Sequence, residues 1–574
     1  MTLNPLLSSS RAIWSLSSSS STPALRPSSA PYKQPPGTVR LEAVACRAPR
    51  QPPTADTPAS PPFISPAVEP EGVGAAAPSP GERFLDYQQA RDTAALVLKQ
   101  RGSKEEKKKK SARGNAGSSS AAFCCYGCGA PLQTEVEDAP GYVDYDTFEL
   151  KKMHHQLRSI LCGRCKLLSH GHMVTAVGGH GGYSGGKQFI LAEELREKLS
   201  DIRHEKVLIV KLVDIVDFNG SFLARIRDLT GANPIILVVT KVDLLPKDTD
   251  LNCVGDWVVE ATLKKKLNVI SVHLTSSKSL VGITGVISEI KKEKKGRDVY
   301  ILGSANVGKS AFINALLKMM ANKDPVAAAA HKYRPMQSAV PGTTLGRIKI
   351  EAFQGGGNLF DTPGLHLHHR QAAVVHSEDL PSLAPQSRLR GQSFPVNSKG
   401  NPAAPDIVIL NGFSFFWGGL VRIDVLKVLP QTRLRFFGPR KLQIVMVPTA
   451  EADKFYHKEV GVSLTPPSEK QRDQWPGLQS VHPLKIKFEG QKRPASDIAI
   501  SGLGWISVEP YGLEMGENEH VDYKGGELHL DVHLPRPVEV FVRPPLPVGP
   551  TSAEWYQYRE LTESEEELRP KWYY

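Results

Sequence analysis

The sequence feature that most constrains this chain is the run GSANVGKS at Gly303–Ser310, which fits the phosphate-binding pattern G-x-x-x-x-G-K-[ST]. The apolar residues 299–302 before it predict a buried strand, and apolar residues at helical spacing predict a helix over 311–320. A strand, a tight turn and a helix N-terminus point several backbone N–H groups into one concavity that suits phosphate. In such a loop Lys309 reaches the β- and γ-phosphates, and Ser310 holds Mg²⁺.

The length of 574 residues is enough for about four domains. No apolar run approaches the ~18 residues that a membrane-spanning helix needs, so we expect a protein without a membrane span. The net charge is +12, but residues 1–41 carry +4 of it and residues 101–113 carry +5. The charge of the whole chain is therefore weak evidence for nucleic-acid binding by the folded domains.

Residues 1–50 are rich in serine and proline, contain no acidic residue before Glu42 and lack a continuous apolar core. This composition predicts an organellar transit peptide rather than a secretory signal, and the serine runs favour the chloroplast over the mitochondrion. An ordinary disordered tail is the alternative. Residues 51–120 are predicted to be disordered, with a basic linker at 104–110 that would add only sequence-independent attraction to nucleic acid.

Four of the seven cysteines form two Cys-x₂-Cys pairs: Cys125 with Cys128, and Cys162 with Cys165. Each pair places two sulfurs at a tight turn, and four thiolates suit tetrahedral zinc in a structural site. The module predicted over 121–190 must accommodate 33 residues between the pairs, more than a common zinc ribbon has. Disulfides are the alternative, which a reducing organelle interior disfavours.

Strand and helix patterns alternate between residues 200 and 370. Apolar runs predict buried strands at 207–213, 235–239 and 269–274, with helices near 219–230, 251–267 and 283–295. Near-continuous apolar strands separated by helices predict an α/β domain whose mostly parallel sheet is covered on both faces.

Polar signatures follow two of these strands. Thr240-Lys241-Val242-Asp243 resembles the guanine-specificity signature of GTPases, Asn-Lys-x-Asp, whose aspartate accepts two hydrogen bonds that adenine cannot offer. Ser276, Ser277 and Lys278 follow the next strand and resemble the loop that contacts guanine O6.

Two further signatures follow the phosphate loop. Pro341–Thr344 and Asp361–Gly364 resemble the two switch signatures of GTPases, with Thr344 near the metal and Asp361 on the metal's water shell. The backbone N–H of Gly364 would face the γ-phosphate. The guanine signatures thus precede the phosphate loop, which is the reverse of the ordinary order. This order predicts a circular permutation, since chain ends can move to loops without disturbing a sheet.

These signatures give one set of candidate site residues. The predicted nucleotide-binding and catalytic residues are Thr240, Lys241, Asp243, Ser276, Ser277, Lys278, Gly303, Asn306, Gly308, Lys309, Ser310, Thr344, Asp361 and Gly364. Ser310, Thr344 and Asp361 are the predicted Mg²⁺ residues.

Two positions depart from the usual pattern. Thr240 stands where asparagine is usual, so guanine preference should persist through Asp243 with weaker binding. Leu365 stands where Ras-type enzymes have a water-orienting glutamine. Similar enzymes with an apolar residue there hydrolyse GTP slowly, often with help from K⁺, and Asn306 resembles their K⁺ ligand. We expect His366 and its neighbouring histidines to lie on a surface loop rather than to act as a base.

The C-terminal third shows a different pattern. Residues 371–405 are polar and are predicted to be a flexible insertion, and residues 406–574 are predicted to form a mixed α+β domain. Alternation at 485–488 and 528–534 predicts half-buried strands in it.

Basic residues outnumber acidic ones between residues 420 and 445, with Phe436 and Phe437 among them. A basic face with stackable rings suits RNA. A solvated strand face with phenylalanines in the core is the alternative. The basic residues are Arg422, Lys427, Arg433, Arg435, Arg440 and Lys441.

The two cysteine pairs, the rotated order of GTPase signatures and the segment Asp497–Trp505 (DIAISGLGW) together resemble the YqeH family, in its plant organellar branch called nitric-oxide-associated protein. The resemblance covers about residues 120–574. It implies a circularly permuted GTPase that assists assembly of the small, 30S-type ribosomal subunit, with ribosomal RNA or the subunit as partner. The cofactors predicted from the signatures are GTP or GDP, Mg²⁺ and Zn²⁺, and whether K⁺ is needed stays open. The resemblance implies plastid protein synthesis as the context, and the predicted location is the chloroplast stroma, with the mitochondrion as alternative.

Two other functions stay open at this point. A non-enzymatic zinc- and RNA-binding scaffold would bind nucleotide but barely hydrolyse it, which Thr240 and Leu365 would permit. Nitric oxide synthesis, suggested by the name of the branch, finds no flavin or nicotinamide fingerprint and no haem-ligating cysteine outside the two pairs. Arginine-dependent turnover by the pure protein would support it. We expect slow GTP hydrolysis instead.

Overall fold

The computed structural model describes residues 123–170, 192–223, 226–338, 342–394, 410–429, 432–488, 493–510 and 526–574. The transit-peptide and linker predictions for residues 1–120 lie outside these ranges, as does Pro341. Within the described ranges, no helix combines the length and the apolar character needed to cross a bilayer.

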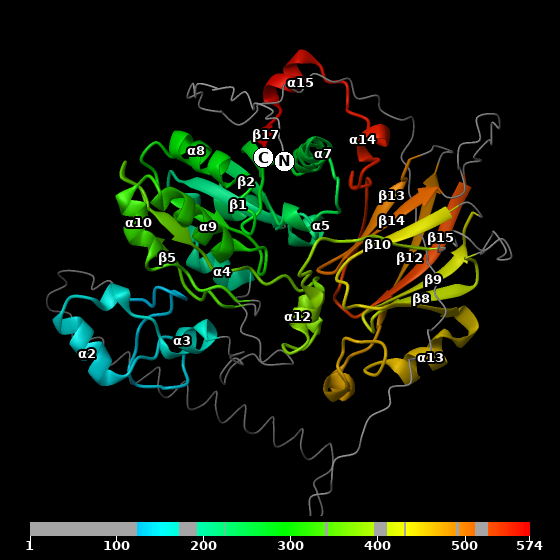
Figure 1. Cartoon of the computed structure of the whole chain (residues 1–574), viewed down its shortest axis with the longest axis horizontal. Coiled ribbons are helices and arrows are strands. Elements are labelled where there is room, and N and C mark those ends of the chain that lie inside the picture. Colours follow the sequence, from blue (N-terminus) through cyan, green and yellow to red (C-terminus); the bar gives the residue numbers. More distant parts are fainter. Residues whose placement is uncertain are drawn as a thin grey trace, which may run out of the picture. The chain divides into compact units, whose positions relative to one another are not determined.

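A seven-stranded sheet forms the centre of the region that follows the cysteine module (Figure 1). Its spatial order is β17 (Lys571–Tyr573), β3 (Val269–Leu274), β2 (Ile235–Thr240), β1 (Leu208–Asp214), β4 (Val299–Leu302), β6 (Leu359–Asp361) and β5 (Ile348–Ile350). Every neighbouring pair is parallel except β5 with β6. The predicted strands and the mostly parallel sheet are confirmed. The loops after β1, β2, β3, β4 and β6 therefore meet at one edge.

Helices cover both faces of this sheet, as predicted. On one face, α8 (Ile283–Lys294) and α9 (Lys309–Ala321) pack against alternate residues of β1 and β2. On the other face, α7 (Leu251–Leu263) packs through Trp257 and its neighbours. The smaller elements of this region are α4 (Ala192–Lys198), η2 (Ser200–Arg203), α5 (Phe218–Ser221), α6 (Ile226–Thr230), η3 (Val242–Leu244) and α10 (Pro325–His331).

The helix predicted over 219–230 is replaced by the short helices α5 and α6. Gly220 in α5 is packed so closely that an added Cβ would lie 2.3 Å from both Asp217 Oδ1 and Ser501 Oγ. This turn is thus shaped by long-range contacts rather than by helical periodicity.

The last strand of the sheet comes from the far end of the chain. Arg569 is buried and pairs with Asp256 Oδ1 of α7 at 2.9 Å. Trp572 lies where a Cβ on Gly255 would be 2.5 Å from its ring, and Tyr573 stacks on His273 with ring centroids 4.9 Å apart. Residues 569–573 were predicted to belong to the C-terminal domain, but they complete the edge of the α/β sheet, because their contacts are with α7 and β3.

The rest of the C-terminal part consists of two antiparallel five-stranded sheets. One runs β16 (Val540–Arg543), β13 (Ser496–Ile500), β14 (Gly504–Pro510), β10 (Thr432–Phe437) and β7 (Gln392–Phe394). The other runs β11 (Ile444–Pro448), β8 (Phe413–Trp417), β9 (Val421–Lys427), β15 (Gly526–Leu534) and β12 (Ser480–Phe488). One apolar core takes side chains from both sheets, which makes a β-sandwich.

The strands predicted at 485–488 and 528–534 lie inside β12 and β15 and are confirmed. The predicted mixed α+β domain is predominantly β among its described residues, because its helical elements are short. They are η4 (Thr449–Glu451), α13 (Ala452–Glu459), η5 (Glu469–Gln474), α14 (Ser552–Trp555) and α15 (Glu563–Leu568).

The prediction of a flexible insertion over 371–405 is wrong for residues 371–394. They form α11 (Gln371–Val374), α12 (Leu380–Leu383) and β7. Val375, Leu380 and Phe394 are buried in the core of the sandwich, an apolar contribution that the polar composition of the segment hid. Residues 395–409 lie outside the described ranges.

The prediction of stackable rings at residues 436 and 437 is also wrong. Phe436 is in the core of the sandwich, and Phe437 stacks on Trp505 at 4.8 Å. Arg422 is buried against Asp424, and Arg435 pairs with Glu509. The alternating pattern of β10 placed both rings in packed layers, which composition alone could not reveal.

The buried side chain of His273 should make the stability of the sheet edge at β3 depend on pH. Burial lowers the pKa of this histidine from its ordinary 6.5 to about 3, so the folded state keeps it neutral while the unfolded chain takes up a proton below pH 6.5. The stability that the neutral His273 contributes to the fold is fully present above pH 6.5 and is lost as the pH falls from 6.5 towards its folded-state pKa of about 3. Between pH 7.5 and 5.5 we expect the opening free energy of the β3 amides to fall by about 1.4 kcal/mol.

Hydrogen exchange of peptides that cover 269–275 measures this opening at both pH values. His273→Phe, which keeps a ring on Tyr573, should remove most of the pH dependence. An equal pH dependence in the two proteins would contradict the assignment to His273.

Candidate functional site

The phosphate loop connects β4 to α9 with two residues in the left-handed region, Asn306 (φ 61°) and Gly308 (φ 91°). The turn brings the side chain of Lys309 back over the loop, where Nζ donates to the carbonyl oxygens of Gly303 at 3.3 Å and Ser304 at 2.8 Å. Burial lowers the pKa of Lys309 to about 8, while the nearby carboxylate of Asp361 opposes this shift. The loop thus holds a buried cation that an anionic ligand would stabilise.

Three oxygen-bearing side chains meet at the start of α9. Ser310 Oγ donates to Asp361 Oδ2 at 3.1 Å, and Thr344 Oγ1 lies 3.5 Å from both of those atoms. Burial raises the pKa of Asp361 to about 6. Its Oδ1 has no hydrogen-bond partner among the described residues. A buried carboxylate with an unpartnered oxygen and two hydroxyls is a donor set that fits Mg²⁺.

The loop after β2 is bonded directly to the phosphate loop. Thr240 Oγ1 lies 3.0 Å from Val213 O and 2.8 Å from Val307 O. Lys241, in the left-handed region, donates from Nζ to Asn306 O at 3.1 Å. The hydroxyl at position 240 therefore joins β1, β2 and the phosphate loop.

The loop after β3 lies against the loop after β2. Val242 N donates to Thr275 O at 3.2 Å, and Ser276 Oγ accepts from the backbone N–H of Lys278 at 3.2 Å. Asp243 is half-buried in η3. The structure thus brings both predicted guanine loops to the edge that carries the phosphate loop.

A cavity of about 280 Å³ lies at this edge. It is lined by Lys241, Asn306, Gly308, Lys309, Ser310, Thr344 and Gly364 among the predicted residues. The other predicted residues do not line it: Thr240, Asp243, Ser276, Ser277, Lys278, Gly303 and Asp361. The side chain of Lys278 is exposed.

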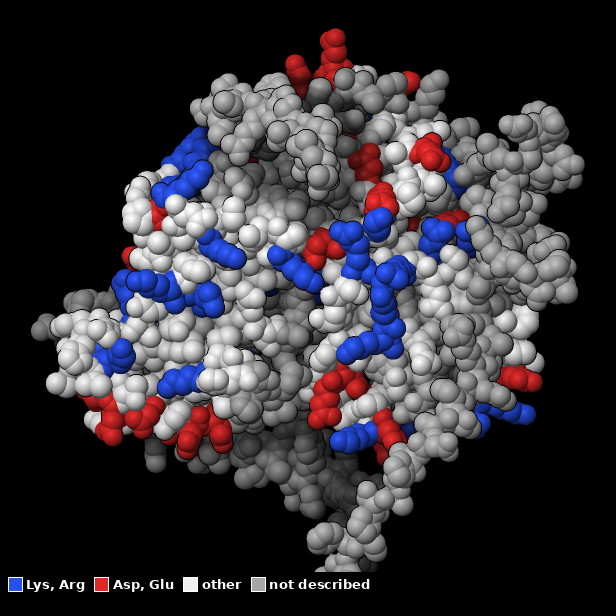
Figure 2. All heavy atoms as spheres, in the orientation of Figure 1, with Lys and Arg blue, Asp and Glu red and all other residues white. Residues whose placement is uncertain are grey.

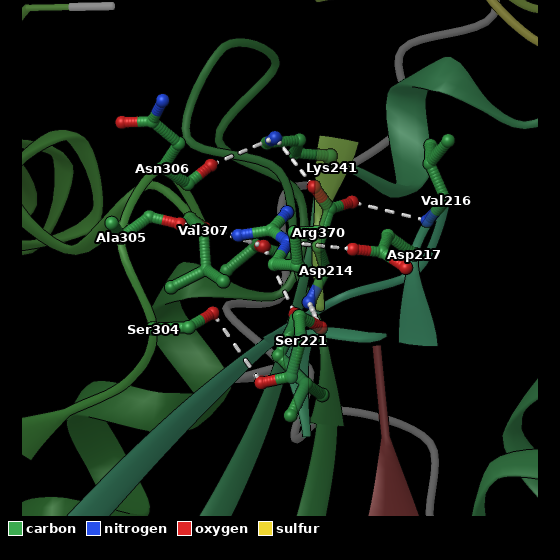
Figure 3. Close-up of polar contacts among 12 residues, drawn as sticks. Asp214, Val216, Asp217, Ser221, Lys241, Ser304, Ala305, Asn306, Val307 and Arg370 are labelled. Atoms are coloured by element: carbon green, nitrogen blue, oxygen red, sulfur yellow. Dashed lines mark hydrogen bonds and ion pairs between the residues drawn. The ribbon is translucent and has the colours of Figure 1, made fainter. Parts of the chain in front are cut away.

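A polar cluster that the sequence did not predict supports the phosphate loop (Figure 3). Asp214, at the end of β1, accepts from Lys241 Nζ at 2.6 Å. Asp217 accepts from Arg370 Nε at 2.8 Å, and Arg370 Nη1 donates to Ala305 O at 2.7 Å. Burial raises the pKa of Asp217, and the guanidinium beside it opposes the shift. Two aspartates directly after a buried strand were the available signal for part of this cluster.

The histidines after the Asp361–Gly364 signature do not all lie on the surface, contrary to the prediction. His368 is exposed, but His366 is buried and lines the cavity. His369 contacts Gly220 O through Nε2 at 3.0 Å. The segment is held inward because the next residue, Arg370, pairs with Asp217.

The four predicted cysteines converge in the module that contains α2 (Tyr145–Met153), η1 (Leu157–Ser159) and α3 (Gly163–Ser169). One ligand sulfur from each of Cys125, Cys128, Cys162 and Cys165 lies within 4.8 Å of the others, and all four residues are fully buried. The neighbouring thiols lower the pKa of Cys162 well below its usual range by hydrogen bonding. Hydrogen bonding within the cluster also lowers the pKa of Cys125 and raises the pKa of Cys128 and of Cys165. The convergence of four sulfurs at one point is compatible with zinc.

Two family models match parts of the chain. The model described as "YqeH-like, C-terminal" matches residues 431–546. The model described as "50S ribosome-binding GTPase" matches residues 298–384, which contain the phosphate loop and the Asp361–Gly364 signature.

Full-length relatives extend this likeness over most of the chain. A rice protein named "Putative nitric oxide synthase" is 69% identical over 512 residues, which cover 88% of this chain and 92% of the relative. The Arabidopsis thaliana protein named "NO-associated protein 1, chloroplastic/mitochondrial" is 66% identical over 510 residues, 88% of this chain and 91% of its own length. Bacillus subtilis YqeH is 30% identical over 419 residues, 73% of this chain and 98% of the relative. The chain therefore belongs to the YqeH family of GTPases, in the branch of the plant nitric-oxide-associated proteins.

Proposed function

We propose that the protein is a circularly permuted GTPase that binds GTP and GDP in the cavity at the sheet edge and hydrolyses GTP slowly. The observation that carries the proposal is the joining of three loops, in which Thr240 bonds to Val307 and Val242 bonds to Thr275. The sheet order supports the permutation. β4, which leads into the phosphate loop, lies between β1, which precedes it in sequence, and β6, which follows it.

The proposed layout is a zinc module over 121–190, a GTPase domain over 200–370 and a C-terminal β-domain. To the GTPase domain we add β17, because it pairs with β3. The C-terminal domain begins earlier than residue 406, since β7 pairs with β10.

For phosphate binding, the backbone N–H groups of the loop and the buried ammonium of Lys309 supply the positive potential. When bound, Mg²⁺ would neutralise charge on the β- and γ-phosphates, and Ser310, Thr344 and Asp361 would hold it. Gly364 lies close to the ammonium of Lys309, because an added Cβ there would be 2.8 Å from Lys309 Nζ. We therefore assign its backbone N–H to the γ-phosphate that Lys309 would bind.

For base recognition, Asp243 is the proposed acceptor for the two guanine N–H groups, with Ser276, Ser277 and Lys278 as the backing loop. Thr240 lacks the amide that would contact guanine N7. Its hydroxyl is instead used to hold the phosphate loop through Val307 O. Guanine preference then depends on Asp243 more than in enzymes with asparagine at position 240.

Slow hydrolysis is supported by the environment of Leu365. Its backbone N–H donates to Gly303 O and its carbonyl accepts from Ala305 N, while its side chain packs in an apolar cluster. This position supplies no group that could orient water. We propose that Lys309 stabilises the transition state electrostatically. Ser310, Thr344 and Asp361 would hold Mg²⁺ and Asn306 would hold K⁺, and both ions would add positive charge to this stabilisation.

The switch segment connects directly to the C-terminal domain. Gln371 N donates to Ser501 O at 2.9 Å, and Glu539 N donates to His369 O at 3.1 Å. Gly502 is in the left-handed region and packs closely on the same segment. An added Cβ there would lie 2.9 Å from Gln371 N and 3.1 Å from Arg370 Cβ. A movement of Gly364 on loss of the γ-phosphate would therefore reach the segment 497–505.

We propose that this coupling gates binding to a small ribosomal subunit precursor. Arg388 and Arg390 before β7, and Arg440 and Lys441 after β10, are exposed, and β7 pairs with β10. Figure 2 shows lysine and arginine side chains in a band near the middle of the face drawn, with acidic side chains above and below it. Since Phe436 and Phe437 are buried, RNA contact here would use phosphate charges and not stacking.

The chloroplast is the proposed location, with the mitochondrion as alternative. The composition of residues 1–50 supports an organellar address. The name of the Arabidopsis relative includes both organelles.

Base specificity tests the proposed role of Asp243. Asp243→Asn should weaken GTP binding about 100-fold, because it removes a charged acceptor of two hydrogen bonds. The same variant should favour xanthosine triphosphate, whose O2 accepts from the new amide. Competition against a fluorescent GTP analogue measures both. Asp248→Asn, an exposed aspartate in the same loop, should change neither, and unchanged GTP affinity in Asp243→Asn would contradict the proposal.

Single-turnover hydrolysis in K⁺ and in Na⁺ tests the proposed chemistry. We expect slow turnover that is faster in K⁺ and is lost in Lys309→Ala. Equal rates in the two salts would remove K⁺ from the mechanism. Turnover that does not depend on Lys309 would favour a scaffold that binds nucleotide without hydrolysing it.

Sedimentation of organellar extract tests the partner. With a non-hydrolysable GTP analogue, the protein should migrate with 30S-sized particles, and with GDP it should return to the top of the gradient. The description of the matching GTPase model names the 50S subunit. Migration with 50S particles would correct the proposed subunit, and migration that ignores the nucleotide would contradict gating.

A further inference from the structure

The first cysteine knuckle, Cys125–Cys128, is bonded to both sides of the segment that carries Thr344. Upstream, Met336 N donates to Gly127 O at 2.9 Å. Downstream, Cys128 O accepts from Leu345 N at 2.7 Å and from Gly346 N at 3.2 Å. Two carbonyl oxygens of the metal-binding turn thus fix backbone groups on either side of a predicted Mg²⁺ residue.

The second knuckle, Cys162–Cys165, holds the same segment through Arg164. Its Nη1 donates to Thr343 O at 3.2 Å, and its Nη2 donates to Gly342 O at 2.9 Å. The guanidinium is partly buried, so water competes weakly for these bonds. Thr344 therefore lies between two residues held by Arg164 and two held by Cys128.

Apolar packing joins the same elements. Met336 and Leu345 pack against the core formed by the four cysteines and their neighbours. Tyr126, inside the first knuckle, meets Tyr333 edge to face with ring centroids 5.5 Å apart. The small core of the cysteine module is completed by residues from the GTPase domain.

The two backbones also touch without side chains between them. A Cβ on Gly346 would lie 2.1 Å from Gly129 O, and a Cβ on Gly129 would lie 2.5 Å from Gly346 O. Neither position has room for a methyl group. The contact depends on this close approach.

We propose that the two cysteine knuckles position Thr344, with Arg164 as the principal positioning side chain, so that the metal in the cysteine cluster and the GTP-bound nucleotide site are thermodynamically linked. This inference rests on the proposed function, because it assigns Thr344 to the metal of the nucleotide site. The cluster metal would fix the carbonyl positions of Gly127 and Cys128, since the turn forms around the metal's ligands.

Linkage is reciprocal, so a nucleotide that draws Thr344 inward must in turn hold the cluster metal more tightly. GDP lacks the γ-phosphate, so it should draw Thr344 inward less strongly and increase the affinity of the cluster for its metal less than GTP does. The segment 342–346 is thereby a connection between two ligand sites that share no residue.

A chelator competition measures the reciprocal effect without turnover. The zinc-loaded full chain is mixed with the chromogenic chelator 4-(2-pyridylazo)resorcinol, in the presence of Mg²⁺ with either GDP or a non-hydrolysable GTP analogue. At equilibrium we expect the chain to hold zinc about 5-fold more tightly against the chelator with the GTP analogue than with GDP, within the usual range of couplings. Arg164→Ala should reduce the difference to less than 2-fold.

Two matched variants keep the test specific. Arg158→Ala removes an arginine of the same module that makes an exposed ion pair with Glu351, and it should preserve the 5-fold difference. Gly346→Ala should abolish the difference by separating the backbones. Gly355→Ala, where an added Cβ meets only Lys294 Nζ at 3.7 Å, should preserve it.

Nucleotide affinity, measured by fluorescence in the same samples, separates the possible failures. If both nucleotides bind the wild-type chain and zinc release is equal, the linkage is overturned and the proposed GTPase function stands. If neither nucleotide binds, the proposed function is overturned and the linkage with it. If Arg164→Ala keeps the full difference, Arg164 is not the positioning residue.

Discussion

The structure depends on one geometric constraint, which is that the parallel strands of the seven-stranded sheet end at the same edge. The hydroxyl of Thr240 shows how this constraint is used, because it lies within hydrogen-bonding distance of carbonyl oxygens in β1 and in the phosphate loop. Lys241 adds a second bond to the phosphate loop and a third to Asp214. A buried cation at Lys309 and a buried carboxylate at Asp361 then face each other inside this frame. Each makes the other's charge less costly to bury.

The chain crosses between its structural parts more often than a row of independent domains would. Arg569 and Trp572 return from the C-terminal end to pack on α7, while Trp505 of the β-sandwich shares an apolar cluster with Trp257. Met336 and Leu345 complete the core of the cysteine module. The elements around the cavity are thus held from several directions. Because these neighbours are tightly packed, a displacement at the cavity edge would be transmitted to them.

The local chemistry was readable from the sequence wherever spacing determined it. Apolar runs gave β1 to β4, and the two Cys-x₂-Cys pairs gave a cluster whose sulfurs converge. Long-range partners were not readable. The residues around Arg370 in the sequence do not indicate that it pairs with Asp217. The three residues of β17 are too few to predict a strand. Composition misled at residues 371–394 and at Phe436, because a polar average conceals the few apolar side chains that pack.

In the proposed function, one nucleotide pocket is assembled from loops that lie far apart in the chain and meet in rotated order. Amide hydrogen exchange of the full chain, with Mg²⁺ and a non-hydrolysable GTP analogue or without nucleotide, tests it most directly. Nucleotide addition should protect the amides of four segments together: 240–245, 275–282, 303–312 and 342–346. Protection confined to 303–312, with the loops after β2 and β3 unchanged, would contradict it.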